Sequence, residues 1–199
     1  MSRNDTIVIV PGARYPNSEN PFIQSVIVKL LGLFNVIPSP TDTEEEWIRA
    51  LENGNRQIIR FVWSGRASVH SVRKAARELA SLIRKYPSVT VVSCSLGTQV
   101  ALLATKRNND IRKIVSLSGV YRRSDTPFPI IDIRSSDDPF ANVFHAILNL
   151  FSLTSKPTQQ IILEGIRHDE FGTDVLLQKG KFSGRNISDV IESFIDPSV

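Results

Sequence analysis

Short apolar runs and longer amphipathic stretches alternate along this chain. The apolar runs are rich in β-branched residues and are bounded by Gly, Pro, Ser or Asp, as buried strands usually are. The amphipathic stretches repeat apolar residues at three- and four-residue steps, which is typical of helices. The alternation predicts an α/β fold with a mainly parallel sheet of about six strands and helices on both faces.

The predicted elements follow from these two patterns. Strand patterns cover Ile7–Gly12, Phe34–Ile37, Gln57–Trp63, Val89–Val92, Pro129–Arg134 and Gln160–Leu163. Helix patterns cover Pro21–Leu33, Thr43–Asn53, Ala67–Tyr86, Gln99–Lys106, Asn142–Leu150 and Ile187–Ile195. We expect the loops that follow the strands to gather along one edge of the sheet, where ligands bind in such folds. No predicted connection is long enough to form a large lid.

The segment Val89–Val100 holds the most informative motif, a predicted strand that turns into a helix at Ser-x-Ser-x-Gly. Ser95 lies at the hinge, where its hydroxyl projects from the carboxyl end of the strand and backbone N–H groups of the next turn point at the same space. Gly97 supplies the room that the turn needs. The motif predicts Ser95 as a nucleophile, and an ordinary turn with a capping serine is the alternative. Cys94, the only cysteine, is predicted to be a core residue.

A serine nucleophile needs a histidine to take its proton and a carboxylate to orient that histidine. Of the three histidines, His70 and His145 lie in predicted helices and are interpreted as surface or packing residues. His168 follows the predicted strand Gln160–Leu163 on a loop, so it is the candidate base. A solvated loop histidine is the alternative.

The candidate carboxylates follow the predicted strand Pro129–Arg134. Asp137 and Asp138 lie in the turn after it, and Asp138 directly precedes Pro139. Both are candidates for the acid, although one of them is expected to cap the next helix, a common role for aspartate. Asp132 lies in mid-strand and is less suited to the role.

The order Ser95, Asp138, His168, each just past a predicted strand, resembles the α/β-hydrolase superfamily, and most closely its small, lid-less bacterial lipases and esterases. The resemblance implies a Ser-His-Asp triad that cleaves carboxylic esters or thioesters through an acyl-enzyme. It also implies that Asp138, rather than Asp137, is the acid, and that Ile114–Gly119 is the core strand after the one that leads to Ser95.

An oxyanion hole is implied as well, formed by the backbone N–H groups of Ala13 and Leu96. The chain departs from the superfamily's pattern at two places. Pro11-Gly12 stands where His-Gly is often found, and Ser93 replaces the first glycine of Gly-x-Ser-x-Gly. A small residue is kept at the second place, which preserves the close approach of strand and helix.

Composition restricts the other classes of function. The chain has 199 residues, of which 41% are hydrophobic, and this suits a single domain spanning residues 1–199. We find no metal-ligand motif and no nucleotide-binding motif, so no cofactor or metal is expected. The apolar runs are interrupted by charged and small residues, so no membrane span is predicted, and without a signal-peptide pattern we expect a cytoplasmic protein.

Five arginines follow predicted strands, on the side where a site would lie. They are Arg14, Arg66, Arg122, Arg123 and Arg167. The simpler interpretation is a solvated surface, because exposed charges usually contribute little. The alternative is an anionic substrate, for which Arg14 and Arg167 are the candidate ligands, or an encounter with a membrane surface guided by these groups. The arginines are not interleaved with aromatic residues, so nucleic acid is not expected as a partner.

Two classes of function therefore remain. The first is a serine hydrolase acting on a small-molecule ester or thioester. The second is a catalytically silent binding or scaffold protein that has kept the fold, because a fold alone does not determine a function. A complete triad in the expected order favours the enzyme.

Overall fold

The fold of the chain is that of a computed structural model. The structure describes residues 6–12, 48, 51, 56–66, 68–106, 110–119, 121, 126–138, 157–166, 171 and 175–195. Every structural statement below concerns these residues.

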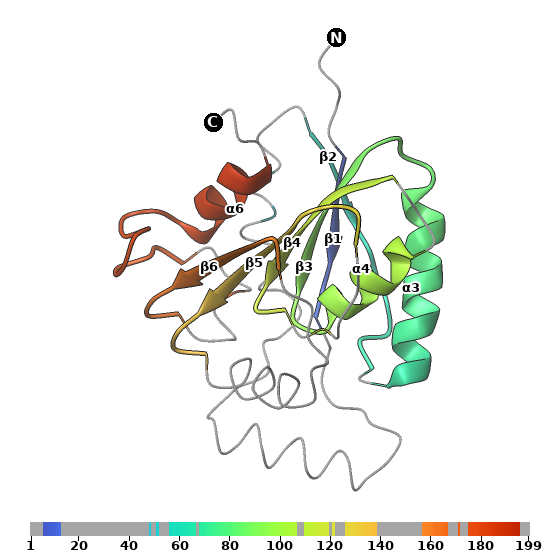
Figure 1. The fold of residues 1–199 in the computed structure, drawn as a ribbon, viewed down its shortest axis with the longest axis horizontal. Coiled ribbons are helices and arrows are strands. Elements are labelled where there is room, and N and C mark those ends of the chain that lie inside the picture. The colour runs from blue at the N-terminus through green and yellow to red at the C-terminus, as the bar shows by residue number, and fades with distance from the viewer. Residues whose placement is uncertain are drawn as a thin grey trace, which may run out of the picture.

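A six-stranded, all-parallel sheet forms the centre of the molecule, with the strand order β2-β1-β3-β4-β5-β6 (Figure 1). The strands are β1 (Thr6–Val10), β2 (Gln57–Arg60), β3 (Val89–Cys94), β4 (Ile111–Leu117), β5 (Ile130–Ser135) and β6 (Gln159–Leu163). The inner strands β1, β3, β4 and β5 are almost entirely buried, as expected where helices cover both faces of a parallel sheet. The predicted fold class is confirmed.

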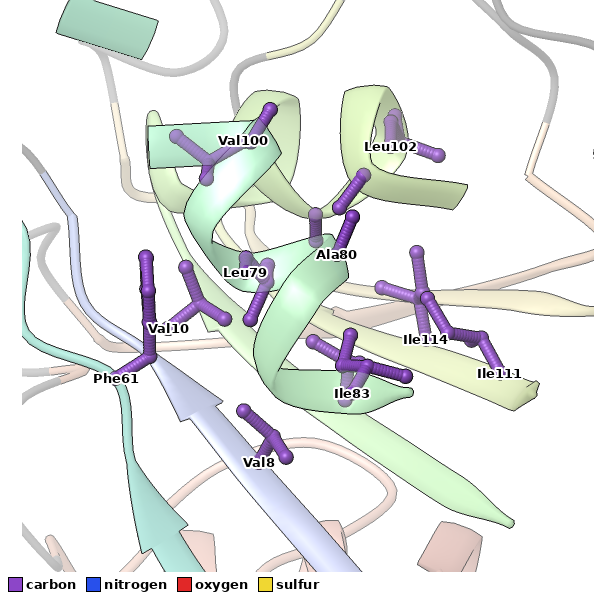
Figure 2. Close-up of a cluster of buried hydrophobic side chains, with 14 of the residues drawn as sticks. Val8, Val10, Phe61, Leu79, Ala80, Ile83, Val100, Leu102, Ile111 and Ile114 are labelled. Atoms are coloured by element: carbon purple, nitrogen blue, oxygen red, sulfur yellow. The ribbon is translucent and has the colours of Figure 1, made fainter. Parts of the chain in front are cut away.

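Helices pack on both faces of this sheet. On one face lie α3 (Val69–Ile83) and α4 (Gly97–Thr105), and on the other lies α6 (Ile187–Ile195) (Figure 1). Because successive side chains of a strand point to opposite faces, each strand contributes to two cores. In β1, Val8 and Val10 join the core under α3 and α4, whereas Ile7 and Ile9 join the core under α6. Figure 2 shows the first core, in which Leu79 and Ile83 of α3 reach toward β1.

The cap of α3 shows why that helix begins where it does. Ser68 has an extended backbone, and its Oγ accepts a hydrogen bond from the N–H of Ser71 at 3.2 Å, which is the usual N-cap interaction. The buried stripe of the helix begins only at Val72. Val69, the first residue of the helix, is apolar but 67% exposed because it lies in the first turn, before the helix meets the sheet.

Most predicted elements are present with small shifts of their ends. The strand predicted to reach Trp63 ends at Arg60, and Trp63 is buried as part of the loop that follows. The helix predicted at Ile187–Ile195 has those bounds in the structure. Of the helix predicted at Thr43–Asn53, Ile48 and Leu51 are described, and both are helical and buried. The elements predicted at Pro21–Leu33, Phe34–Ile37 and Asn142–Leu150 lie outside the described residues.

No helix within the described part of the chain is long and apolar enough to cross a membrane.

Candidate active site

Ser95 lies in a strained turn at the carboxyl end of β3. Its φ is 46°, in the left-handed region that residues with a side chain rarely adopt. It follows the last residue of β3 and precedes α4 by two residues, and its N–H donates to the carbonyl of Leu117 in β4 at 3.0 Å. Such strain persists only where the surrounding structure enforces it, and it is frequent at functional sites. The predicted turn from strand to helix at Ser93–Gly97, called the elbow below, is therefore present as a geometric feature.

Gly97 makes this turn possible. A Cβ at Gly97 would lie 2.4 Å from the carbonyl oxygen of Pro11 and 2.5 Å from that of Val10, far inside van der Waals contact. The start of α4 therefore lies directly against the end of β1. Trp63 holds the same segment, because its indole N–H donates to the Pro11 carbonyl at 3.0 Å. Only glycine fits at position 97.

One backbone donor, the N–H of Leu96, adjoins Ser95 at the start of α4. The first turn of α4 is closed by hydrogen bonds from Thr98 N–H to Ser95 O and from Gln99 N–H to Leu96 O, each 3.1 Å long. The N–H of Leu96 precedes these bonds, so the helix itself does not use it. On the other side, a Cβ at Gly12 would lie 3.2 Å from the Cβ of Ser95, so the segment after β1 runs beside the serine. The arrangement suits an oxyanion at the start of α4.

Ser93 explains the departure from glycine at the first position of the motif. Its side chain is fully buried, and its hydroxyl lies 3.0 Å from the hydroxyl of Thr98 in α4. The Thr98 hydroxyl in turn lies 3.1 Å from that of Ser116 in β4. The small side chain of Ser93 thus leaves room for α4, and its hydroxyl also links β3 to that helix.

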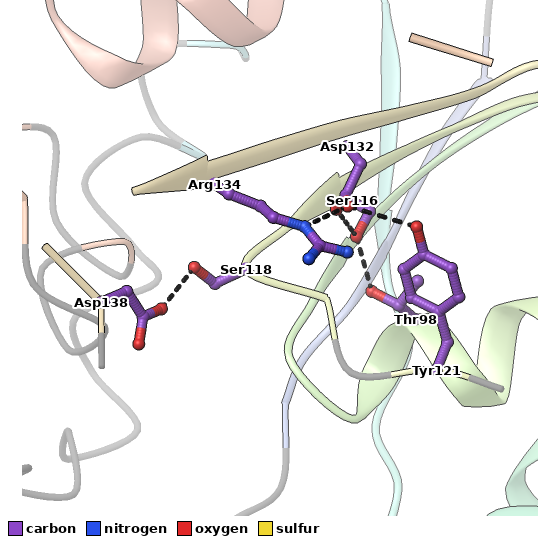
Figure 3. A network of polar contacts seen from close by, with 7 residues as sticks. All are labelled: Thr98, Ser116, Ser118, Tyr121, Asp132, Arg134 and Asp138. Atoms are coloured by element: carbon purple, nitrogen blue, oxygen red, sulfur yellow. Dashed lines mark hydrogen bonds and ion pairs between the residues drawn. The ribbon is translucent and has the colours of Figure 1, made fainter. Parts of the chain in front are cut away.

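The chain of hydroxyls ends at a buried carboxylate, that of Asp132 in β5. Ser116 Oγ donates to Asp132 at 3.0 Å, Tyr121 OH donates at 3.2 Å, and Arg134 Nε donates in an ion pair (Figure 3). Burial, reinforced by the charge of Asp132, raises the pKa of Tyr121 well above its usual value, so the phenol keeps its proton and remains a donor. The Asp132 carboxylate thus accepts from three neighbouring side chains. This agrees with the expectation that Asp132 is less suited to be the catalytic acid.

Sequence reasoning did not identify this cluster, although one signal was present. Asp132 and Arg134 are spaced by two residues in an otherwise apolar strand, so their side chains lie on the same face. Two opposite charges on one face of a buried strand indicate a pair, because an unpaired charge is too costly to bury.

Asp138 and Asp137 have different environments. Asp138 is fully buried, and its carboxylate accepts a 2.7 Å hydrogen bond from the hydroxyl of Ser118, which follows β4 (Figure 3). The carboxylate of Asp137 instead accepts from the backbone N–H of Gly165 at 2.6 Å, at an exposed position. The helix that one of them was expected to cap lies outside the described residues.

The turn that carries these aspartates is tied to the loop after β6. Besides the bond from Gly165 to Asp137, the hydroxyl of Ser135 donates to the carbonyl of Ile166, and the N–H of Ser136 donates to the carbonyl of Leu163 at 2.9 Å. Ile166 is buried in the core under α6. Ile166, two residues before His168 in the sequence, is therefore held beside the aspartate turn.

Comparison with known proteins decides the fold family. No protein-family model matches the chain, and neither does any curated protein. Solved structures do match it across nearly its whole length. An α/β hydrolase enzyme from the metagenome of sediments of the Mar Chica lagoon in Morocco matches with a TM-score of 0.58 at 12% identity, over 98% of this chain and 92% of that one.

Mouse α/β hydrolase domain-containing protein 10 matches with a TM-score of 0.57 at 11% identity, over 98% of this chain and 90% of that one. The hyperthermophilic esterase of the archaeon Pyrobaculum calidifontis also gives 0.57, at 12% identity, over 97% of this chain and 76% of that one. This chain has the α/β-hydrolase fold. The fold that the sequence resemblance implied is confirmed.

Within this α/β-hydrolase fold, the structure describes only some of the predicted site residues. Ser95 and Leu96 are half-buried at the end of β3, and Asp138 is buried past the end of β5. Four residues, namely Ala13, Arg14, Arg167 and His168, lie outside the described residues, and so do Arg122, Arg123 and His145. Ser95, Ser118 and Asp138 thus follow three neighbouring strands at one edge of the sheet.

The residues assigned to other roles fit those roles in part. His70 is exposed on α3, as its position in the amphipathic pattern suggested. Cys94 is half-buried and packs against the core under α6. Arg66, in the loop after β2, is exposed. Among the described residues, no group of three or more His, Cys, Asp or Glu side chains is arranged to hold a metal ion.

Proposed function

We propose that this protein is a serine hydrolase that cleaves carboxylic ester or thioester bonds, with Ser95 as nucleophile, His168 as general base and Asp138 as the acid. The observation that carries the proposal is the conformation of Ser95. A non-glycine residue with φ of 46° directly follows a central strand, and the turn is so tight that only Gly97 fits beside Pro11. An ordinary capping serine needs no such strain, because N-cap residues are usually extended.

The chemistry assigned to these residues is acyl transfer. Ser95 Oγ attacks the carbonyl carbon of the substrate, and His168 accepts the hydroxyl proton and passes it to the leaving alcohol or thiol. Water then attacks the acyl-enzyme with the same histidine as base, which releases the acid and restores Ser95. The backbone N–H groups of Leu96 and Ala13 stabilise the oxyanion in both steps.

The position of Asp138 supports its role as the acid. It is fully buried, whereas Asp137 is already engaged with Gly165. A buried carboxylate can orient an imidazole and stabilise its cation without competition from water. The assignment of His168 rests on its place in the sequence, and the anchoring of Gly165 and Ile166 to the aspartate turn supports it.

The nature of the substrate is inferred more broadly. Structures similar to this one include esterases and carboxylesterases, which supports a small-molecule ester as the substrate class. Arg66 is exposed past the end of β2, and Arg14 and Arg167 follow β1 and β6 in the sequence. We include an anionic ester in the proposal on the basis of these charges.

A fluorophosphonate probe tests the proposal directly. The probe reacts with an activated serine and not with a structural one, so the wild-type protein should be labelled at Ser95 and Ser95→Ala should not. Cys94→Ala is the matched control, because it changes the adjacent residue and should be labelled normally. If the wild-type protein is not labelled and hydrolyses no ester or thioester, the alternative of a silent binding protein replaces the enzyme.

A further inference from the structure

Ser118 has two unusual properties that the proposed triad does not use. Its φ is 45°, and its side chain is only 1% exposed. It follows Leu117, the last residue of β4, and its N–H donates to the carbonyl of Ile133 in β5 at 2.8 Å. Ser118 is therefore held between the strand that leads to Ser95 and the strand that leads to Asp138.

The hydroxyl of Ser118 donates to Oδ2 of Asp138 at 2.7 Å, and both side chains are buried (Figure 3). A hydrogen bond to an ionised carboxylate is stronger than one between neutral groups. With one of its oxygens bound, the carboxylate of Asp138 has a defined rotation. Glycine would adopt the same backbone conformation without strain, but it has no hydroxyl to offer.

We propose that Ser118 is a positioning residue for the hydrolase, whose hydroxyl orients the Asp138 carboxylate for His168. This inference rests on the proposed function. The strained conformation of Ser118 is then explained in the same way as that of Ser95. Each serine directly follows its strand in the left-handed region, and this conformation directs the hydroxyl of Ser118 toward the aspartate turn.

Charged side chains described on β4, on β5 and in the aspartate turn have partners of their own. On β5, Asp132 and Arg134 form an ion pair with each other, and Figure 3 shows this pair apart from the contact between Ser118 and Asp138. In the same turn, Asp137 binds Gly165 N–H. On β4, Lys113 is directed to the carbonyls of Phe194 and Ile195 at the end of α6. Ser118, by contrast, donates directly to the carboxylate of Asp138.

The test compares Ser118→Ala and Ser118→Gly with the wild-type enzyme on an activated ester. Both variants lose the hydroxyl, but the glycine variant also relieves the backbone strain. We expect kcat to fall about tenfold in both, with KM changed less than about twofold, because a hydrogen bond to a charged group is lost.

The decisive readout is the pH dependence of kcat/KM. Without the donor, the charge of the ionised Asp138 carboxylate is less well satisfied, so the carboxylate stabilises the imidazolium of His168 more strongly. This raises the pKa of His168 and moves the acid limb of the profile upward, by about one pH unit. Ser116→Ala is the matched control, because it removes a buried hydroxyl that donates to Asp132 instead. It should lower stability and leave the acid limb in place.

The outcomes separate this inference from the proposed function. If the wild-type enzyme is active and both Ser118 variants keep its acid limb, Ser118 is only structural and the inference is wrong, while the proposed function stands. If the wild-type protein neither reacts with the fluorophosphonate probe nor hydrolyses esters, the proposed function is wrong and the role of Ser118 fails with it.

Discussion

Ser95 and Ser118 occupy matching positions at the ends of neighbouring strands, and both have φ close to 45°, with values of 46° and 45°. The register pairs Ser93 with Ser116 and Cys94 with Leu117, so each serine directly follows the last pair of its strand. Their surroundings differ, however. Ser95 is half-buried and followed by a helix, whereas Ser118 is buried against Asp138. One backbone conformation therefore presents a candidate nucleophile on one strand and a ligand of the candidate acid on the next.

Replacing Ser95 by alanine should abolish hydrolysis of an activated ester. Loss of a triad nucleophile costs several orders of magnitude in turnover, while alanine keeps the Cβ and hence the packing of the turn. Initial rates with a chromogenic ester and the thermal unfolding midpoint measure the two effects. Cys94→Ala should keep most of the activity. Wild-type turnover in Ser95→Ala would show that another residue is the nucleophile.

Replacing the two aspartates separately should identify the acid. Asp138→Asn should lower kcat severely, because an amide cannot stabilise the imidazolium of His168. Asp137→Asn should affect stability slightly or not at all, since its amide oxygen can still accept the hydrogen bond from Gly165 N–H. Steady-state kinetics on both variants provides the comparison. An inactive Asp137→Asn beside an active Asp138→Asn would move the acid to position 137.

Gly97→Ala should destabilise the fold and inactivate the enzyme together. The added Cβ would lie 2.4 Å from the carbonyl of Pro11, so the start of α4 must move away from β1. We expect a loss of about 2 kcal/mol or more in the free energy of unfolding, measured with urea, and loss of ester hydrolysis.

Gly184→Ala is the matched control for that experiment. An added Cβ there meets no heavy atom within 4 Å, but the φ of 82° makes any side chain strained. It should cost about 1–2 kcal/mol of stability and leave activity unchanged. Full stability in Gly97→Ala would contradict the close approach of α4 and β1.

Asp132→Ala should destabilise the protein by about 3–5 kcal/mol in urea unfolding, because the buried guanidinium of Arg134 would lose its counter-charge. A double variant, Asp132→Leu with Arg134→Met, removes both charges and should recover part of this loss. Recovery stays partial because the hydroxyls of Ser116 and Tyr121 would lose their acceptor. A double variant no more stable than Asp132→Ala would show that the ion pair is not the source of the effect.

An ester carrying a carboxylate or phosphate should have a higher kcat/KM than its neutral analogue, and the preference should shrink as salt is added. Arg14→Gln and Arg167→Gln should weaken the preference without slowing hydrolysis of the neutral ester. Arg73→Gln, on the exposed face of α3, is the control and should change neither. Equal use of both esters at low salt would leave only the solvated-surface interpretation of the arginines.

The sequence by itself determined the class of fold and the position of the elbow. Both depend on local patterns, namely runs of β-branched residues, helical periodicity and the spacing of Ser95 and Gly97. These patterns act over a few residues, so they can be recognised without knowing which strands are neighbours. The bounds of α6 and the presence of β3 and β5 were predicted for this reason.

Only the tertiary structure decided the contacts around the elbow. Ser118 and Asp138 are 20 residues apart in sequence, and Gly165 and Asp137 are 28 apart. The order and register of the strands bring them together, and neither leaves a signal in a local window of sequence. Ser93 illustrates the same limit. Its hydroxyl contacts that of Thr98 in α4, and the Thr98 hydroxyl contacts that of Ser116 in β4. Neither contact can be predicted before the positions of α4 and β4 are known. Side chains acquire their partners through the sheet, and the sheet forms between segments that are distant in the chain.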